Sequence, residues 1–338
     1  MECKVKKADI VHQILRGAHA VPAGDRQAQG MGYAPTNIAL CKYWGKRDNE
    51  LNLPVTSSLS IALPDKGAMT TLSWNERAED VVVLNGTQVA PDSAFVTRLI
   101  HYLDLFRSDE KWYLNIDIKM NIPVAAGLAS SACGFASLIC ALNDLMKWHL
   151  PHRELSILAR MGSGSAARSL WNGFVFWHEG MREDGMDSFG EPLNIEWPAL
   201  RIGILPISEQ QKPISSRDAM LRTVNSSSLY SSWPRKVSQD LSIFKQALKA
   251  RNFSLLGGTA ESNALAMHAT MLSSWPPICY FMPETLKAMK QIWQLRNEGC
   301  EVYFTEDAGP NLKLLFLDTQ LDKIKNVFPE MDVILPFE

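Results

Sequence analysis

The sequence predicts an α+β protein with two domains. Apolar periodicity marks strands and helices that follow one another without strict alternation, which favours layered α+β packing over a doubly wound sheet. The length of 338 residues is sufficient for two such domains. A polar, turn-rich segment, S-E-Q-Q-K-P-I-S-S-R-D, follows Pro206. We therefore expect an N-terminal domain over residues 31–206 and a C-terminal domain over residues 207–338.

The first thirty residues are mixed in charge and lack an apolar stretch of signal-peptide length. The part from Ala18 to Gly30 is rich in alanine, glycine and polar residues. We expect residues 1–30 to form a flexible N-terminal extension outside the core.

The elements of the N-terminal domain are predicted from apolar patterns and turn residues. Alternation predicts short strands, and recurrence at helical spacing predicts helices, one of which ends at Gly162 as its C-cap. The expected strands are Thr70–Trp74, Val81–Leu84, Leu114–Met120, Asn172–Trp177 and Leu200–Pro206, and the expected helices are Ser93–Leu105, a long helix opening at the turn Pro123–Ala132, and Glu154–Met161.

The C-terminal domain is predicted to begin with helices and to end in a mixed pattern. The expected helices are Lys236–Lys249, Phe253–Met271 and Glu284–Asn297. The expected order after them is strand Glu301–Thr305, turn Asp307–Asn311, strand Leu312–Leu317, helix Leu321–Val327 and strand Met331–Leu335.

Composition and charge exclude several classes of function. A net charge of -2 gives no general attraction to nucleic acid or to an anionic membrane surface. No run approaches the roughly 18–20 apolar residues that span a bilayer. The six cysteines form no C-x-x-C pair, so neither a zinc site nor a disulfide framework is indicated. Isolated histidines such as His178 and His268 have no partner at metal-ligand spacing. Because the cysteines are scattered and suggest no disulfides, a cytoplasmic location fits best.

The segment P-V-A-A-G-L-A-S-S-A, from Pro123 to Ala132, joins a predicted strand to a predicted helix. Small residues at a helix N-terminus let an anion approach unpaired N–H groups, and the helix dipole favours negative charge. The same turn could instead serve close packing of strand and helix. The absence of the Walker A lysine excludes a P-loop NTPase. The consecutive hydroxyls of Ser130 and Ser131 favour the phosphate interpretation.

A second segment, A-P-T-N-I-A-L-C-K-Y-W-G-K-R-D, spans residues 34–48. Its cations Lys42, Lys46 and Arg47 lie within six residues, beside two aromatic side chains, and could hold a multiply charged anion. Most lysine clusters are only solvated surface loops. The hydroxyl-rich stretch Asn52–Ser60 that follows favours a lined cleft.

Two further segments carry polar chemistry. G-S-G-S-A-A-R-S, residues 162–169, matches a dinucleotide fingerprint but follows a helix rather than a strand, which excludes a Rossmann site. Two interpretations remain. The segment is an anion-binding turn in which Arg168 donates paired hydrogen bonds to a carboxylate or phosphate, or it is an ordinary turn between helices. T-E-D-A-G-P-N, residues 305–311, taken alone is common turn chemistry.

Together these four segments closely resemble the GHMP kinase superfamily and, within it, the diphosphomevalonate decarboxylase family. The phosphate loop marks the superfamily, and the other three segments mark the decarboxylase branch, as do E-S-N-A-L-A-M-H-A-T (residues 261–270) and P-P-I (residues 276–278). The similarity runs from about residue 32 to near the C-terminus. It implies a GHMP kinase fold, with an N-terminal domain like domain 2 of ribosomal protein S5 and a ferredoxin-like C-terminal domain.

The resemblance also implies a reaction. Such enzymes use ATP and Mg²⁺ to decarboxylate mevalonate 5-diphosphate to isopentenyl diphosphate, and they are usually cytosolic homodimers. Three alternatives stay open: a decarboxylase of mevalonate 5-phosphate, a kinase such as mevalonate 3-kinase, and a binding module that senses ATP or isoprenoids. The intact set of Lys42, Arg168 and Asp307 argues against the last two.

Roles follow from the resemblance, position by position. Asp307 would face the 3-hydroxyl of the substrate, Lys42 would stabilise charge beside it, and Arg168 would clamp the substrate carboxylate with Asn37 holding the guanidinium. The substrate diphosphate would be bound by Tyr43, Lys46, Ser163, Gly164, Ser165, Ser216 and Arg217. The ATP phosphates would be bound by Gly127, Leu128, Ala129, Ser130 and Ser131, with Mg²⁺ bridging them.

The chain departs from the family pattern at two places. Glu306 stands where the family usually has an apolar residue, so it could raise the pKa of Asp307, reach Mg²⁺, or simply point away. The N-terminal extension is also atypical and suggests no role.

Overall fold

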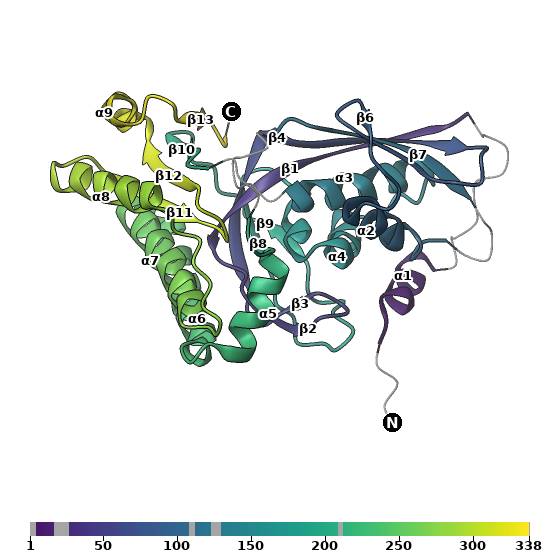
Figure 1. The fold of residues 1–338 in the computed structure, drawn as a ribbon, viewed down its shortest axis with the longest axis horizontal. Coiled ribbons are helices and arrows are strands. Elements are labelled where there is room, and N and C mark those ends of the chain that lie inside the picture. The colour runs from purple at the N-terminus through teal and green to yellow at the C-terminus, as the bar shows by residue number, and fades with distance from the viewer. Residues whose placement is uncertain (1–4, 17–26, 108–111, 123–129, 209–211, 338) are drawn as a thin grey trace.

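The computed structural model describes residues 5–16, 27–107, 112–122, 130–208 and 212–337. Two layered halves lie side by side, each with a sheet covered by helices (Figure 1). This arrangement confirms the α+β class. Within the described ranges, no helix is long and apolar enough to cross a membrane.

The N-terminal half is built on a seven-stranded sheet in the order β6-β5-β7-β4-β8-β9, with β1 also paired to β4. Helices α1–α4 lie together on one side of this sheet (Figure 1). The elements are α1 (Lys7–Leu15), β1 (Gln29–Cys41), β2 (Lys46–Asp48), β3 (Leu53–Pro54), β4 (Ser58–Asn75), β5 (Val81–Leu84), β6 (Thr87–Gln88), α2 (Ala94–Leu103), β7 (Tyr113–Met120), α3 (Ser130–Leu145), α4 (His152–Gly162), the 3₁₀ turn η1 (Gly164–Arg168), β8 (Phe174–Trp177) and β9 (Gly190–Pro192).

The C-terminal half contains an antiparallel sheet in the order β11-β12-β10-β13. Helices α6 and α7 pack on each other, and α7 contacts β11. The elements are β10 (Leu200–Leu205), α5 (Ser216–Ser226), η2 (Tyr230–Ser232), α6 (Trp233–Ala250), α7 (Phe253–Leu272), α8 (Pro283–Asn297), β11 (Val302–Glu306), β12 (Leu312–Leu317), η3 (Asp318–Gln320), α9 (Leu321–Val327) and β13 (Asp332–Ile334).

Strand β1 is shared by the two hydrophobic cores. Its pairing with β4 shifts register between Pro35 and Thr36, after which every residue of the strand is buried. Ala34 belongs to the N-terminal core, whereas Ile38 and Cys41 pack with side chains of α6 and α7 in the C-terminal one. The end of β1 therefore delivers the residues that follow it to the junction between the halves.

Helix α3 lies directly against β1. A Cβ atom at Gly32 would come within 2.4 Å of the backbone nitrogen of Ala141, so only glycine permits this approach. The close packing fixes the N-terminus of α3, which begins at Ser130, relative to β1.

Two expectations need correction, and two elements were missed. Residues 1–30 are not wholly a flexible extension, because α1 buries Ile10, Val11, Ile14 and Leu15 in the N-terminal core. Strand β10 lies before the boundary expected at residue 206, yet it pairs with β12 and β13. Strand β1 and helix α5 were not predicted from the sequence, since neither shows a clean apolar period.

Candidate active site

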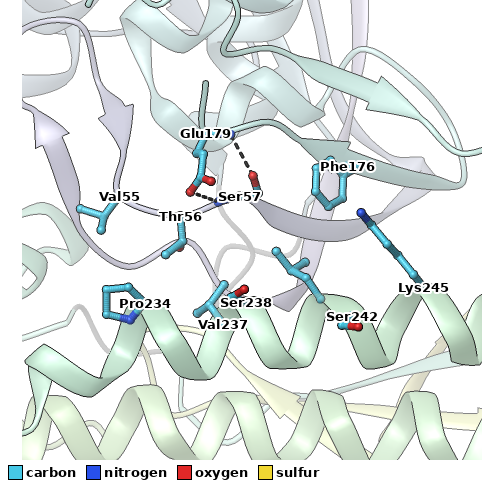
Figure 2. A pocket seen from close by; sticks show the side chains of 11 residues that line it. Val55, Thr56, Ser57, Phe176, Glu179, Pro234, Val237, Ser238, Ser242 and Lys245 are labelled. Carbon is cyan, nitrogen blue, oxygen red and sulfur yellow. Dashed lines mark hydrogen bonds between the residues drawn. The ribbon is translucent and has the colours of Figure 1, made fainter. Parts of the chain in front are cut away.

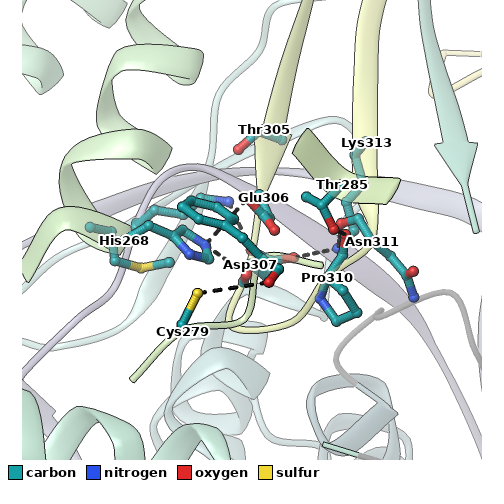
Figure 3. A network of polar contacts seen from close by, with 12 residues as sticks. His268, Cys279, Thr285, Thr305, Glu306, Asp307, Pro310, Asn311 and Lys313 are labelled. Carbon is teal, nitrogen blue, oxygen red and sulfur yellow. Dashed lines mark hydrogen bonds and ion pairs between the residues drawn. The ribbon is translucent and has the colours of Figure 1, made fainter. Parts of the chain in front are cut away.

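Asp307 lies at the junction of the halves, immediately after β11. Its Oδ1 atom is 2.8 Å from Nζ of Lys42, which follows β1, and its Oδ2 atom is 3.3 Å from Nζ of Lys313 on β12. Both lysine side chains are almost fully buried, at 2% and 1% exposure, whereas that of Asp307 is 26% exposed. The carboxylate is therefore the accessible member of the cluster. Figure 3 shows Asp307 and Lys313 together with their neighbours.

The two ammonium groups control the charge of Asp307. Burial alone would raise its pKa, but the charges of Lys42 and Lys313 outweigh burial and hold the pKa of this carboxyl well below its usual range. Burial lowers the pKa of the Lys42 ammonium group, and the charge of Asp307 opposes that shift. Asp307 is thus a carboxylate throughout the physiological pH range.

Glu306 and His268 form a buried layer behind Asp307 (Figure 3). Nε2 of His268 lies 3.1 Å from the Asp307 carbonyl oxygen, to which it must donate, and 3.6 Å from Oε2 of Glu306. Burial lowers the pKa of His268 to about 3, so the ring is neutral. The ring stacks on Phe281. His268 therefore positions the backbone of Asp307.

Glu306 is itself uncharged at neutral pH. Its side chain is completely buried, and neither oxygen has a hydrogen-bond partner in the part of the chain that the structure describes. Burial raises the pKa of Glu306 to about 9, against the effect of Lys313 and Lys42. Asp307 nevertheless keeps a lowered pKa, so Glu306 does not raise the pKa of Asp307 above its usual range.

Arg168 lies at the end of η1, close enough to Asp307 for the two charges to interact. Its side chain is 3% exposed, and Nε donates to Oδ1 of Asn37 at 3.3 Å. Asn37 is fixed in turn, since its amide donates to Oγ of Ser169 at 2.8 Å. Nη1 of Arg168 donates to Ser58 Oγ. The guanidinium is thus held in one orientation and can present its remaining N–H groups to an anion.

Residues Ser163–Ser165, here called the serine turn, follow α4. The helix ends at Gly162 as expected, although Ser163 rather than Gly162 is its C-cap. A Cβ atom at Gly164 would lie 2.8 Å from the Tyr43 hydroxyl, which is buried without a hydrogen-bond partner among the described residues. Oγ of Ser131 lies 3.3 Å from Oγ of Ser163. The predicted ATP side and the predicted substrate side therefore meet here.

Beyond the serine turn, four cations gather from different elements: Lys7 of α1, Lys46 of β2, Arg98 of α2 and Arg217 of α5. Burial lowers the pKa of Lys46 to about 8, and the charges of Arg217, Lys7 and Arg98 contribute to that shift. Arg217 is exposed in the first turn of α5, beside Ser216. We call these four residues the cationic cluster.

Sequence reasoning missed several residues of the site. Lys7 and Arg98 belong to no motif. Lys313 carried a usable signal, because a single lysine within the apolar strand L-K-L-L-F-L requires a buried partner. Lys212, whose charge also acts on Asp307, lay unrecognised in a polar segment. The predicted ATP-loop residues Gly127, Leu128 and Ala129 lie outside the described residues.

A separate hollow of about 420 Å³ lies between α6 and the segment that joins β3 to β4 (Figure 2). Lys245 and Glu179 line it, and Lys245 Nζ lies 5.3 Å from the ring centroid of Phe176. None of the residues predicted for the active site lines this hollow. The hollow is therefore distinct from the cluster around Asp307.

Replacing Glu306 with Gln is expected to stabilise the protein increasingly as pH rises. Burial raises the pKa from 4.5 to about 9, so between these values the folded protein retains a proton that the unfolded chain has lost. Wild-type stability then falls by about 1.4 kcal/mol per pH unit through this group. The free energy of unfolding is measured with urea at about pH 6 and about pH 8. The excess of the Gln variant over the wild type should be larger at the higher pH by about 3 kcal/mol.

The matched control is Glu298→Gln, since Glu298 is exposed on the surface at the end of α8. Its effect should be the same at both pH values. If Glu306→Gln changed the free energy of unfolding by the same amount at both pH values, Glu306 would already be ionised in the folded protein.

Comparison with known proteins gives matches over both halves of the chain. Residues 34–190 match the diphosphomevalonate decarboxylase-like N-terminal domain, and residues 202–333 match the mevalonate 5-diphosphate decarboxylase C-terminal domain. Diphosphomevalonate decarboxylase mvd1 of Aspergillus fumigatus is 37% identical over 84% of this chain and 76% of its own length. The corresponding enzyme of Saccharomyces cerevisiae is 35% identical over 86% of this chain and 78% of its own length.

Solved structures agree in sequence and in fold. The complex of MDDEF with MVAPP, AMPPCP and magnesium is 38% identical, with a TM-score of 0.85 over 91% of this chain and 97% of that chain. Mevalonate diphosphate decarboxylase from Staphylococcus aureus is 34% identical, with a TM-score of 0.84 over 91% of this chain and 96% of that chain. This chain therefore belongs to the diphosphomevalonate decarboxylase family and has its GHMP kinase fold.

Proposed function

We propose that this enzyme converts mevalonate 5-diphosphate to isopentenyl diphosphate in an ATP-dependent decarboxylation. The observation that carries the proposal is the accessible Asp307 carboxylate, held between two buried ammonium groups in the same site as the oriented guanidinium of Arg168. The 3-hydroxyl oxygen takes the γ-phosphoryl group of ATP as the bond to ADP breaks, and the hydroxyl proton is released to solvent. The resulting phosphate then leaves with its bonding electrons, and the C–CO₂ electrons form the alkene as CO₂ departs.

Each of the three charged residues has a distinct task in this reaction. Arg168 clamps the carboxylate that becomes CO₂, which fixes the C–CO₂ bond relative to the leaving phosphate. Lys42 stabilises the negative charge that builds up on the transferred group. Asp307 orients the 3-hydroxyl, and its lowered pKa favours electrostatic guidance over lasting proton capture. No covalent enzyme intermediate is needed.

The nucleotide would be bound at the N-terminus of α3. Ser130 and Ser131 open this helix, so its first-turn N–H groups and two hydroxyls can meet phosphate oxygens. Among the described residues, no group of three or more His, Cys, Asp or Glu side chains is placed to hold a metal ion. The phosphates themselves would therefore supply most ligands of Mg²⁺, which neutralises their charge during transfer.

The reaction is tested by its stoichiometry. With Mg-ATP and mevalonate 5-diphosphate, the purified enzyme should release ADP and CO₂ in equal amounts. ADP without CO₂ would identify a kinase, such as a mevalonate 3-kinase. Turnover only with mevalonate 5-phosphate would identify the monophosphate decarboxylase instead.

We also propose a cytoplasmic homodimer, which the family resemblance supports. The five cysteines that the structure describes are all free thiols, as a reducing compartment requires. Light scattering on the purified protein tests the dimer, since a monomeric mass at micromolar concentration would contradict it.

A further inference from the structure

Helix α1 contacts α4. One ion pair fixes where the C-terminal end of α1 lies along α4. At the C-terminal end of α1, Nη2 of Arg16 lies 3.9 Å from Oε1 of Glu154, in the first turn of α4. The apolar face of α1 is buried in the N-terminal core. Lys7 lies nine residues before Arg16, about 14 Å along α1, and Gly162 lies about 12 Å along α4 from Glu154. An antiparallel alignment of the two helices would place Lys7 level with the end of α4, where the serine turn begins.

Charge interactions agree with the antiparallel arrangement. Burial lowers the pKa of Lys7, Glu50 and, more weakly, Asp48 oppose this shift, and Arg217 and Arg98 lower the pKa further. Arg98 is attached to the far end of α4, because its Nη2 donates to the Gly162 carbonyl oxygen at 2.7 Å. Lys7 therefore faces the same end of α4 as Arg98 does.

Lys46 is attached to that end as well. Its Nζ lies 2.6 Å from Oδ1 of Asn52, whose amide donates to the carbonyl oxygens of Arg160 and Met161 in the last turn of α4. In the described part of the chain, no member of the cationic cluster forms an ion pair with a carboxylate of the protein. Four mutually repelling cations beside a buried, unpartnered tyrosine hydroxyl make a site that an anion would stabilise.

We propose that Lys7 is a substrate-binding residue, through which the N-terminal helix α1 recognises the diphosphate group of the substrate. This inference rests on the proposed function, because it takes Lys46 and Arg217 to bind that group. Helix α1 adds a cation from the N-terminal half, whereas Arg217 comes from the C-terminal half. The apolar face of α1 anchors the helix, so Lys7 is presented from a fixed support rather than from a loose chain.

The added cation favours a diphosphate over a monophosphate. A diphosphate carries more negative charge and extends further, so it can interact with cations on both sides of the cluster at once. A monophosphate is smaller and carries less charge, so it would interact with fewer cations of the cationic cluster. Loss of Lys7 is therefore expected to weaken binding of mevalonate 5-diphosphate more than binding of mevalonate 5-phosphate.

Calorimetric titration of the full-length protein tests the proposal without turnover. The probe is inorganic pyrophosphate, with the nucleotide side occupied by Mg-ADP. Lys7→Met should weaken pyrophosphate binding about tenfold, and Lys7→Arg should restore most of the affinity, because one charge-assisted contact is lost and then regained. Lys245→Met, in the separate hollow of Figure 2, should bind as the wild type does.

Steady-state kinetics give the second readout. Lys7→Met should raise KM for mevalonate 5-diphosphate about tenfold and leave kcat unchanged, since a uniform loss of substrate binding affects KM alone. Wild-type affinity for pyrophosphate in a folded Lys7→Met protein would overturn the role of Lys7. Absence of turnover in the wild type would instead count against the proposed function, and the titration would still decide the role of Lys7.

Discussion

Replacing Asp307 with Asn should abolish turnover while leaving substrate binding almost intact. The amide keeps the shape of the side chain but removes the charge that lies 2.8 Å from Lys42 and 3.3 Å from Lys313. The two ammonium groups would then repel each other, and the 3-hydroxyl would lose its negatively charged acceptor. We expect kcat to fall by about 10³-fold, within the range for loss of such a group. ADP release measures turnover, and calorimetry measures binding of mevalonate 5-diphosphate.

The matched control is Asp332→Asn. Asp332 also pairs with a lysine of the other half, Lys66, at 3.1 Å, but its side chain is 48% exposed. This variant should keep wild-type kcat, because surface ion pairs contribute little. Near-normal turnover in the Asp307 variant, or an equal loss in both variants, would refute the role assigned to Asp307.

The second large effect is expected for Arg168→Lys. The change keeps the charge but removes the planar fork that Asn37 and Ser58 hold in one orientation. An ammonium group cannot make both contacts and also clamp the substrate carboxylate. We expect kcat for CO₂ release to fall by at least about 100-fold, because misplacement of the reacting bond is costly. Simultaneous assays of CO₂ and ADP give the measurement.

Arg153→Lys is the control for this substitution. Arg153 donates a hydrogen bond to the Met186 carbonyl oxygen and lies over the ring of Phe189, but it is exposed and outside the site. It should leave both products unchanged. A kcat for Arg168→Lys within threefold of wild type would mean that Arg168 does not clamp the carboxylate.

The sequence carried much of the fold because local signals agreed with tertiary structure. Strands such as Val81–Leu84 and helices such as Leu321–Val327 occur at their expected bounds, since each has an apolar period and flanking turn residues. Strand β1 escaped because it belongs to two cores, so that nearly all of its second half is buried and no alternation remains. Helix α5 escaped because only three of its residues are buried.

The site was predictable where a motif carried it. Arg168 and Asn37 lie together as the resemblance implied, at a hydrogen-bonding distance that pattern alone could not give. Lys313 and Lys7 depend on pairings between distant segments, namely β12 with Asp307 and α1 with α4. Such long-range pairings leave no periodic trace in a single sequence. The uncharged state of Glu306 likewise depends on complete burial, which neighbouring residues in the chain do not reveal.

The sharing of β1 between two hydrophobic cores has a consequence for how the protein unfolds. Ala34 is embedded in one core, and Ile38 and Cys41 are embedded in the other, only a few residues along the same strand. Neither core can melt without withdrawing β1 from its neighbour. The halves should therefore lose structure in a single cooperative transition. Catalytic activity should be lost at the same denaturant concentration at which the fluorescence of Trp112, in one half, and of Trp233, in the other, changes. An isolated C-terminal half would lack part of its own interior.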